Sequence, residues 1–201
     1  MTNAGTERGR RLARTERHQL IVDAAVRVFE RRGTIAVTYE EIADEAGISR
    51  ALVYNYFADR SALLEAVCQR NAKVLDHDVA VALTTTRGRR EALAASMRAH
   101  LAMARRQPVA YRQASGDPAL GAPRSREQVM VDFLSGMLGN SDDAHVAAAG
   151  LLHAIRSMVT LSVDAPDEDH SVELITAFVA GALAGLERVG MPVRPTWSVP
   201  R

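Results

Sequence analysis

Hydrophobic residues along this chain recur at helical spacing. In the first periodic segment they lie at i, i+4, i+7 and i+8, which places them on one face of a helix; these residues are Ile21, Ala25, Val28 and Phe29. The sequence lacks a convincing period-two alternation of the kind that predicts a β-strand. We therefore predict an all-α fold of about nine helices. The later helices are expected over about 60–81, 90–105, 108–112, 126–138, 142–162 and 172–189, with a loop at 114–125.

Turn and capping residues divide the first third of the chain into short helices. Thr38 is a predicted N-cap, and Glu41 three residues later completes a capping box. Gly47 can supply a left-handed C-cap, and Ser49 can cap the next helix. Two short helices joined by a glycine turn are typical of a helix-turn-helix motif, here over residues 38–57, although such a pair can also have only a packing role.

The second helix of this motif has an inward and an outward face. Val53 and Phe57 are four residues apart and share the inward face. Ala51 and Asn55 lie on the outward side, where a small residue lets the backbone approach a base edge and asparagine can bond adenine. Arg50 can reach guanine. We predict Arg50, Ala51 and Asn55 as contacts to DNA bases.

Polar side chains that flank this face can bind the DNA backbone. Phenol hydroxyls donate to phosphate oxygens, and helix N-termini attract phosphate. Arg60, in the first turn of the following helix, is poorly placed for that helix's own dipole, so an external anion explains it better. The predicted phosphate contacts are Thr38, Tyr39, Ser49, Tyr54, Tyr56 and Arg60.

A long ordered run of residues follows a known pattern. It reads T-x-x-x-I-A-x-x-A-G-I-S from Thr38 to Ser49, then Y-x-Y-F at 54–57 and D-R-x-x-L-L from Asp59. With the first amphipathic helix, residues 15–75 resemble the DNA-binding domain of the tetracycline-repressor (TetR) family of bacterial transcription regulators. The family often has histidine at the position of Tyr56, which keeps a phosphate-directed donor. It often has lysine at the position of Arg60, with the same effect.

The position of Ala58 is often proline or glycine in the family, which makes alanine a mild departure. The resemblance implies that residues 76–201 form an all-helical domain that senses a ligand and forms a dimer.

The last two long helices have broad apolar faces that must be covered in a soluble protein. They span about 144–161 and 172–189, and Ala177, Gly181 and Gly185 form a smooth stripe on the second. One cover is the core of the same subunit. The other is the same pair of helices from a second copy, which we favour because a homodimer reads a pseudo-palindromic operator.

The helices between about 90 and 162 carry residues suited to an apolar ligand cavity. Methionines and aromatic rings can line such a cavity, and histidine or arginine can fix a ligand's orientation. Each candidate also fits an ordinary core or an exposed surface position. The candidates are Met97, His100, Met103, Tyr111, Phe133, His153 and Arg156.

Composition and charge narrow the choice of function. The net charge is +1, but residues 1–18 carry five arginines against two glutamates, or +3, which predicts a flexible arm that either follows phosphates or acts as a solubilising tail. Cys68 is the single cysteine, which suits a reducing cytoplasm. We expect no signal peptide and no membrane span, because the apolar run 177–186 is shorter than the roughly 20 residues that a bilayer requires.

The histidines lack ligand spacing and the serines lack an elbow or a paired base, so we expect no metal, no cofactor and no enzyme activity. The expected function is a cytoplasmic, ligand-responsive transcription regulator. It would be a repressor that binds double-stranded operator DNA as a dimer and is released by an unknown small-molecule effector. The alternatives are a constitutive DNA-binding protein without a ligand and an all-helical enzyme with an attached helix-turn-helix.

Overall fold

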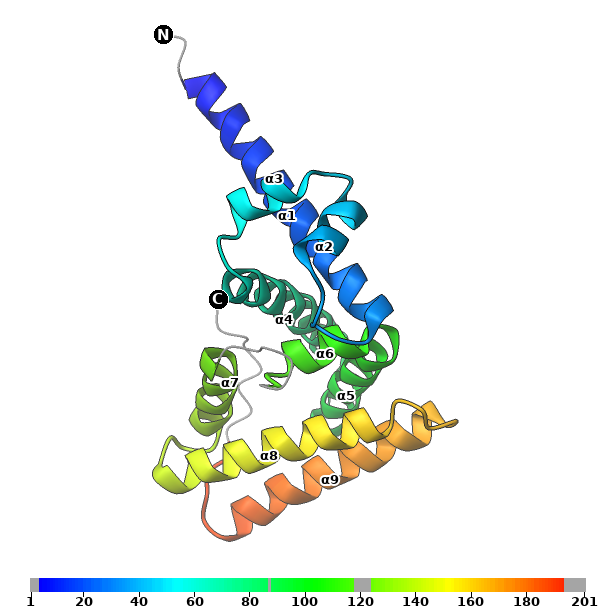
Figure 1. Cartoon of the computed structure of the whole chain (residues 1–201). Coiled ribbons are helices and arrows are strands. Elements are labelled where there is room, and N and C mark those ends of the chain that lie inside the picture. The colour runs from blue at the N-terminus through cyan, green and yellow to red at the C-terminus, as the bar shows by residue number, and fades with distance from the viewer. Residues whose placement is uncertain (1–3, 87, 118–123, 194–201) are drawn as a thin grey trace.

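The computed structural model describes residues 4–86, 88–117 and 124–193, and the regular structure within these ranges is entirely α-helical (Figure 1). This confirms the prediction of an all-α fold with about nine helices. Residues 118–123 of the predicted loop lie outside the described residues. The helices are α1 (Ala4–Arg32), α2 (Tyr39–Ala46), α3 (Arg50–Tyr56), α4 (Arg60–Thr84), α5 (Arg89–Arg106), α6 (Pro108–Ala114), α7 (Arg124–Met137), α8 (Asp142–Leu161) and α9 (Glu168–Arg188).

The predicted caps shape α2 and α3. The Thr38 hydroxyl accepts the backbone N–H of Glu41 at 3.2 Å, and the Glu41 carboxylate accepts the backbone N–H of Thr38 at 2.7 Å. Gly47 ends α2 with φ of 66°, a left-handed conformation that glycine adopts without steric cost. The Ser49 hydroxyl accepts the N–H of Leu52 at 3.3 Å. These bonds confirm the predicted turn geometry of the motif.

Two boundaries differ most from the prediction. The basic N-terminal segment was expected to be a flexible arm, but α1 begins at Ala4, because alanine, arginine, glutamate and leucine favour a helix there. The last helix begins at Glu168 rather than near residue 172, because the Asp167 side chain accepts the N–H of His170 at 2.9 Å and caps it earlier.

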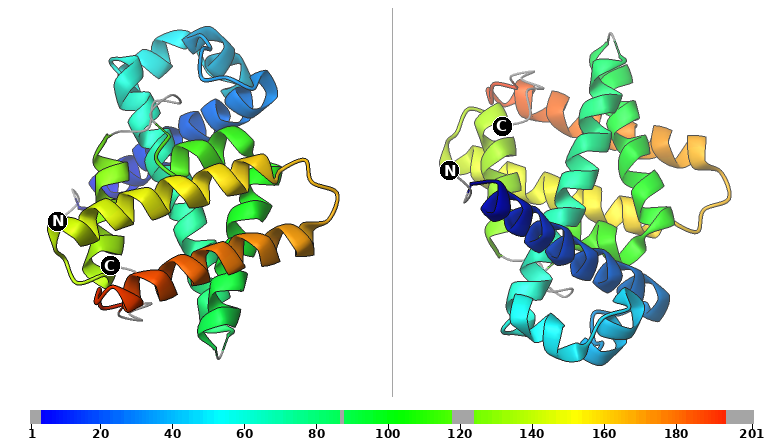
Figure 2. Two further views of the ribbon diagram at one scale, coloured as in Figure 1. Left: turned by 90° about the horizontal axis from the view of Figure 1, so that it is seen from below. Right: turned by 90° about the horizontal axis from the view of Figure 1, so that it is seen from above.

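The helices pack around three hydrophobic clusters. The first joins α1, α2, α3 and the start of α4, and contains Phe29, Ile42, Val53 and Phe57. The second joins the later part of α4 to α5, α6, α8 and α9, and a third lies between α7 and α8. The N-terminal unit, α1–α3, therefore lies at one end of the molecule, and α8 and α9 lie side by side at the other (Figures 1 and 2).

Polar contacts join the N-terminal unit to the rest. The Glu30 carboxylate of α1 accepts the backbone N–H groups of Val109 and Ala110 at 3.2 and 2.6 Å, and so caps α6. Burial raises the pKa of Glu30, and these two bonds act in the opposite direction. Arg70 of α4 pairs with Asp23 of α1 at 3.0 Å. The orientation of α1 thus depends on both α4 and α6.

Phe57 is 3% exposed and packs in the first cluster, whereas Tyr54 is 47% exposed. We expect Phe57→Ala to lower the free energy of unfolding by about 3–5 kcal/mol, because it leaves a cavity. Tyr54→Ala should cost less than about 1.5 kcal/mol, the scale of one aromatic pair. Chemical denaturation of both variants tests this, and equal losses would contradict the assignment of Phe57 to the core.

Candidate functional site

A surface hollow of about 370 Å³ lies at the helix-turn-helix and brings several predicted contacts together. We call it the motif hollow. Four of the six predicted phosphate contacts line it, together with one predicted base contact. Its lining residues are Val37, Thr38, Tyr39, Arg50, Tyr54, Ala58, Asp59 and Arg60.

Aromatic and cationic groups lie close together in the motif hollow. The rings of Tyr39 and Tyr54 have centroids 4.8 Å apart, and the Arg50 guanidinium lies 5.5 Å from the Tyr54 ring centroid. Arg50 also donates to the Tyr54 hydroxyl oxygen at 3.2 Å, so its side chain folds back along α3. The buried Tyr39 hydroxyl has no hydrogen-bond partner among the described residues. Burial, and then the charge of Asp59, raise the pKa of Tyr39, so its hydroxyl stays a donor.

The remaining motif residues divide by helix face as predicted. Ala51 and Asn55 are exposed, and Val53 is fully buried beneath them. Ser49 is exposed at the N-terminus of α3. Tyr56 is half-buried and packs against the first cluster, so this tyrosine contributes to packing as well as facing solvent.

Arg60 has an intrachain partner that its position in the helix did not reveal. Its Nη1 donates to the carbonyl oxygen of Val37 at 2.6 Å, which ties the start of α4 to the segment before α2. An external anion is therefore not the sole partner that can explain the position of Arg60, and its phosphate contact stays a prediction. The carbonyl of Val37 already supplies an acceptor.

Two adjoining hollows lie between α4 and the C-terminal helices. The apolar hollow has a volume of about 150 Å³ and is walled by side chains of α5, α7, α8 and α9. The polar hollow has a volume of about 320 Å³ and adds Asp76, Ser115 and Arg126 to the lining. Both hollows share Val79, His100, Met130, Phe133 and Leu152.

The structure brings three of the seven predicted pocket residues to these hollows. Met97, His100 and Phe133 line them. Tyr111 is buried behind His100, with its hydroxyl 3.4 Å from His100 Nδ1. Met103 is buried in the second cluster and lines neither hollow.

The last two predicted pocket residues also lie elsewhere. His153 is exposed and pairs with Glu127 at 2.7 Å. Arg156 is half-buried near Tyr111, where its charge opposes the rise in the pKa of Tyr111 that burial causes. The helical phase of α8 explains both misplacements, because Leu151, Leu152 and Ile155 present the cavity-facing side instead.

Arg126 is the main cavity residue that the sequence did not indicate. Its Nη2 lies 2.9 Å from Asp76 Oδ1 and its Nε donates to the Ala114 carbonyl at 3.0 Å. It therefore joins α7 to both α4 and α6. A signal existed, since Arg126 lies near a helix N-terminus where a cation opposes the dipole.

His100 is neutral in this setting. Burial lowers its pKa from 6.5 to about 4, while Asp76 opposes the shift. A neutral imidazole has one nitrogen that donates and one that accepts. His100 therefore offers the cavity a hydrogen-bonding group without a charge.

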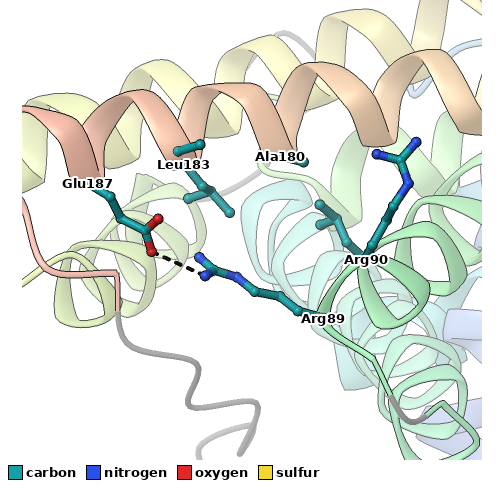
Figure 3. A pocket seen from close by; sticks show the side chains of 7 residues that line it. Arg89, Arg90, Ala180, Leu183 and Glu187 are labelled. Atoms are coloured by element: carbon teal, nitrogen blue, oxygen red, sulfur yellow. Dashed lines mark hydrogen bonds and ion pairs between the residues drawn. The ribbon is translucent and has the colours of Figure 1, made fainter.

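A fourth hollow, a groove of about 250 Å³, lies between the start of α5 and α9 (Figure 3). Arg89 and Glu187 at its rim form an ion pair with a distance of 3.1 Å. Because these two charges neutralise each other, they require no bound ion. Leu93 and Leu183 line both this groove and the apolar hollow.

The outer face of α8 and α9 exposes large apolar side chains. Val146 and Leu161 of α8 are 74% and 84% exposed, and Leu174 and Phe178 of α9 are 53% and 46% exposed. Both helices are long and apolar enough to cross a bilayer by length and composition, but core helices of soluble proteins meet the same criteria. These helices alone do not indicate membrane insertion. Among the described residues no group of His, Cys, Asp and Glu is arranged to hold a metal ion.

The chain is similar to known bacterial regulators. Residues 21–67 match the model of bacterial regulatory proteins of the tetR family. The HTH-type transcriptional activator FasR of Mycolicibacterium smegmatis is 32% identical over 194 residues, which cover 90% of this chain and 89% of FasR.

Solved structures share the fold. A TetR-family regulator from Streptomyces coelicolor superposes with a TM-score of 0.65 at 23% identity, covering 85% of this chain and 99% of that one. AibR, solved in complex with isovaleryl coenzyme A and operator DNA, superposes with a TM-score of 0.59 at 18% identity, covering 81% and 97%.

The low pKa of His100 predicts a pH-dependent stability. The unfolded chain binds the His100 proton near pH 6.5 and the folded chain near pH 4. The contribution of neutral His100 to the free energy of unfolding is therefore complete above pH 6.5 and is lost as the pH falls to about 4. Relative to His100→Gln, the wild type should lose on the order of 3 kcal/mol over this range. Denaturation at several pH values measures the difference.

His170→Gln is the matched control, because His170 is exposed and lines neither hollow. It should keep the loss of stability that His100 causes as the pH falls. A His100→Gln profile parallel to the wild type would contradict the neutral state of the half-buried His100.

Proposed function

The chain belongs to the TetR family of bacterial regulatory proteins, and on this premise we propose that it is a ligand-responsive regulator that binds a pseudo-palindromic operator as a homodimer. Its relatives are DNA-binding transcription regulators rather than enzymes. The observation that carries the proposal is the exposed face of α3, where Ala51 and Asn55 lie beside the cationic and aromatic motif hollow.

In this proposal α3 enters the major groove. Asn55 and Arg50 read base edges, and Ala51 allows close approach. Arg50 would have to leave its hydrogen bond with Tyr54 to reach a base, which its exposed position permits. Thr38 and Tyr54 in the motif hollow, with Ser49 and Tyr56 beside it, would contact phosphates. Tyr39 would do so only after its buried hydroxyl is uncovered. Arg60 would contribute through the guanidinium nitrogens that do not bind Val37.

The dimer would form through α8 and α9. Their exposed apolar side chains, together with the exposed Gly150 and Gly181, offer a face that a second copy can cover as a four-helix interface. A two-fold axis through this face would present two α3 helices to one operator.

The adjoining hollows would hold the effector. A bound ligand that shifts α4 would alter the spacing of the two α3 helices, and a typical allosteric coupling of about 1–3 kcal/mol changes operator affinity roughly 5- to 150-fold. We propose a repressor released by its ligand. An activator is the second candidate, because FasR carries that name. Transcription in vitro from the operator's promoter, with and without the protein, separates the two.

We expect Asn55→Ala to relax base preference at one operator position by about 1–3 kcal/mol. Selection of bound sequences from random DNA, followed by affinity measurement on single-base variants, tests this. Tyr56→Phe is the comparison, and it should weaken binding on every sequence without changing the preferred site. An equal loss for Asn55→Ala on all sequences would refute its base-reading role.

The wild type should sediment as a dimer at micromolar concentration without DNA. Phe178→Arg places a charge on the exposed face of α9 and should produce a monomer, because the charge would be desolvated in the interface. Val81→Arg is the control, since Val81 is exposed on α4 away from that face. A monomeric wild type, or a dimeric Phe178→Arg variant, would count against this interface.

A further inference from the structure

The two hollows form an amphipathic site with one cation. Most of the lining is apolar, and the flexible methionines Met97, Met130 and Met137 can adapt to a bound chain. Arg126, in the polar hollow, is the one Arg or Lys among the described residues that line either hollow. The site therefore has a long apolar part and a polar end at α7.

Arg126 is more enclosed than its partner. Its side chain is 15% exposed, whereas that of Asp76 is 38% exposed. A guanidinium buried to this degree requires an acceptor where it stands, but Asp76 can regain water with little movement. The pair is thus suited to an exchange in which another anion replaces Asp76.

Arg126 also has N–H donors available for the anion of a ligand. A guanidinium has five N–H groups. Nε binds the Ala114 carbonyl, while Nη1 and Nη2 reach the two Asp76 oxygens at 3.4 and 2.9 Å. The Ala114 bond can hold the side chain in place while the other two donors change partner. A carboxylate suits this fork because it can accept two parallel bonds.

We propose that Arg126 recognises the carboxylate of an amphipathic ligand, and that this carboxylate replaces Asp76 as the ion-pair partner of the guanidinium. The apolar tail of the ligand lies among the methionines and Phe133 of the hollows. His100, which lines both hollows, supplies a polar group without adding a second cation. The proposal rests on the ligand-responsive function above and adds the chemical class of the ligand.

The exchange has a structural consequence. The Arg126–Asp76 pair joins α7 to α4, and α4 leads to the N-terminal unit. Its loss releases α4 from α7 at Asp76, a little under two turns beyond the Arg70–Asp23 contact with α1. Ligand binding in the hollows would thereby change the contacts of α4, the helix that follows α3 and packs with it in the first cluster.

The test measures binding of decanoate and 1-decanol by calorimetry without DNA. The two probes have ten-carbon chains and differ in the head group, which is a carboxylate in one and a hydroxyl in the other. We expect the wild type to bind decanoate about tenfold more tightly, as charge-assisted hydrogen bonds would give. Asp76→Asn should raise the affinity for decanoate a further tenfold or so and leave that for decanol unchanged, because the internal competitor is gone.

Two further variants complete the design. Asp78→Asn makes the same change on α4 at a residue that pairs with Arg106 at 3.5 Å, outside the hollows, and should bind both probes as the wild type does. Arg126→Met should lose the preference for decanoate. If Arg126→Met does not fold, Asp76→Asn alone decides the question.

Equal affinity for the two probes, no binding of either, or an Asp76→Asn variant with unchanged affinity for decanoate would overturn the proposal. Operator binding is measured separately on the same preparation. Failure of the carboxylate site would therefore leave the DNA-binding function standing, and failure of operator binding would be recognised independently.

Discussion

A buried amide pair fixes where α4 crosses α6, and the position of the N-terminal unit follows from that crossing. The Asn71 Nδ2 group donates to Gln113 Oε1 at 3.1 Å, and both side chains are fully buried. A buried amide that loses its partner carries a desolvation cost of about 1–3 kcal/mol, so the two helices cannot slide freely past each other. Glu30 adds a second constraint by capping α6 from α1.

This constraint connects the cavity with the DNA-facing end. α6 ends at the polar hollow with the Ala114 carbonyl, followed by Ser115, and its first turn is held by Glu30. α4 carries Asp76 at the same hollow and Arg70 at the contact with α1. Two helices therefore run from the candidate effector site to the N-terminal unit, and the buried amide pair makes them move together.

Caps and helical periodicity predicted the helix-turn-helix motif well, but they could not predict contacts between residues far apart in the sequence. The caps at Thr38 and Ser49 and the inward place of Phe57 depend on neighbours within four residues, and each is present. The Arg60–Val37 and Arg126–Asp76 contacts join residues 23 and 50 positions apart. Periodicity cannot report such pairs, because it gives each helix a face but no neighbour. The DNA roles of Arg50, Ala51 and Asn55 stay predictions.

α4 belongs to two cores at once. Leu63 and Val67 pack in the first cluster, and Leu75 packs in the second. A hybrid protein that exchanged the helices after the α4–α5 turn for those of another regulator would give Leu75 and Asn71 foreign neighbours. A workable junction would have to fall inside α4, before Asn71, so that this residue travels with Gln113. Recombination among such regulators would then keep the second half of α4 together with α5 to α9, and not with α1 to α3.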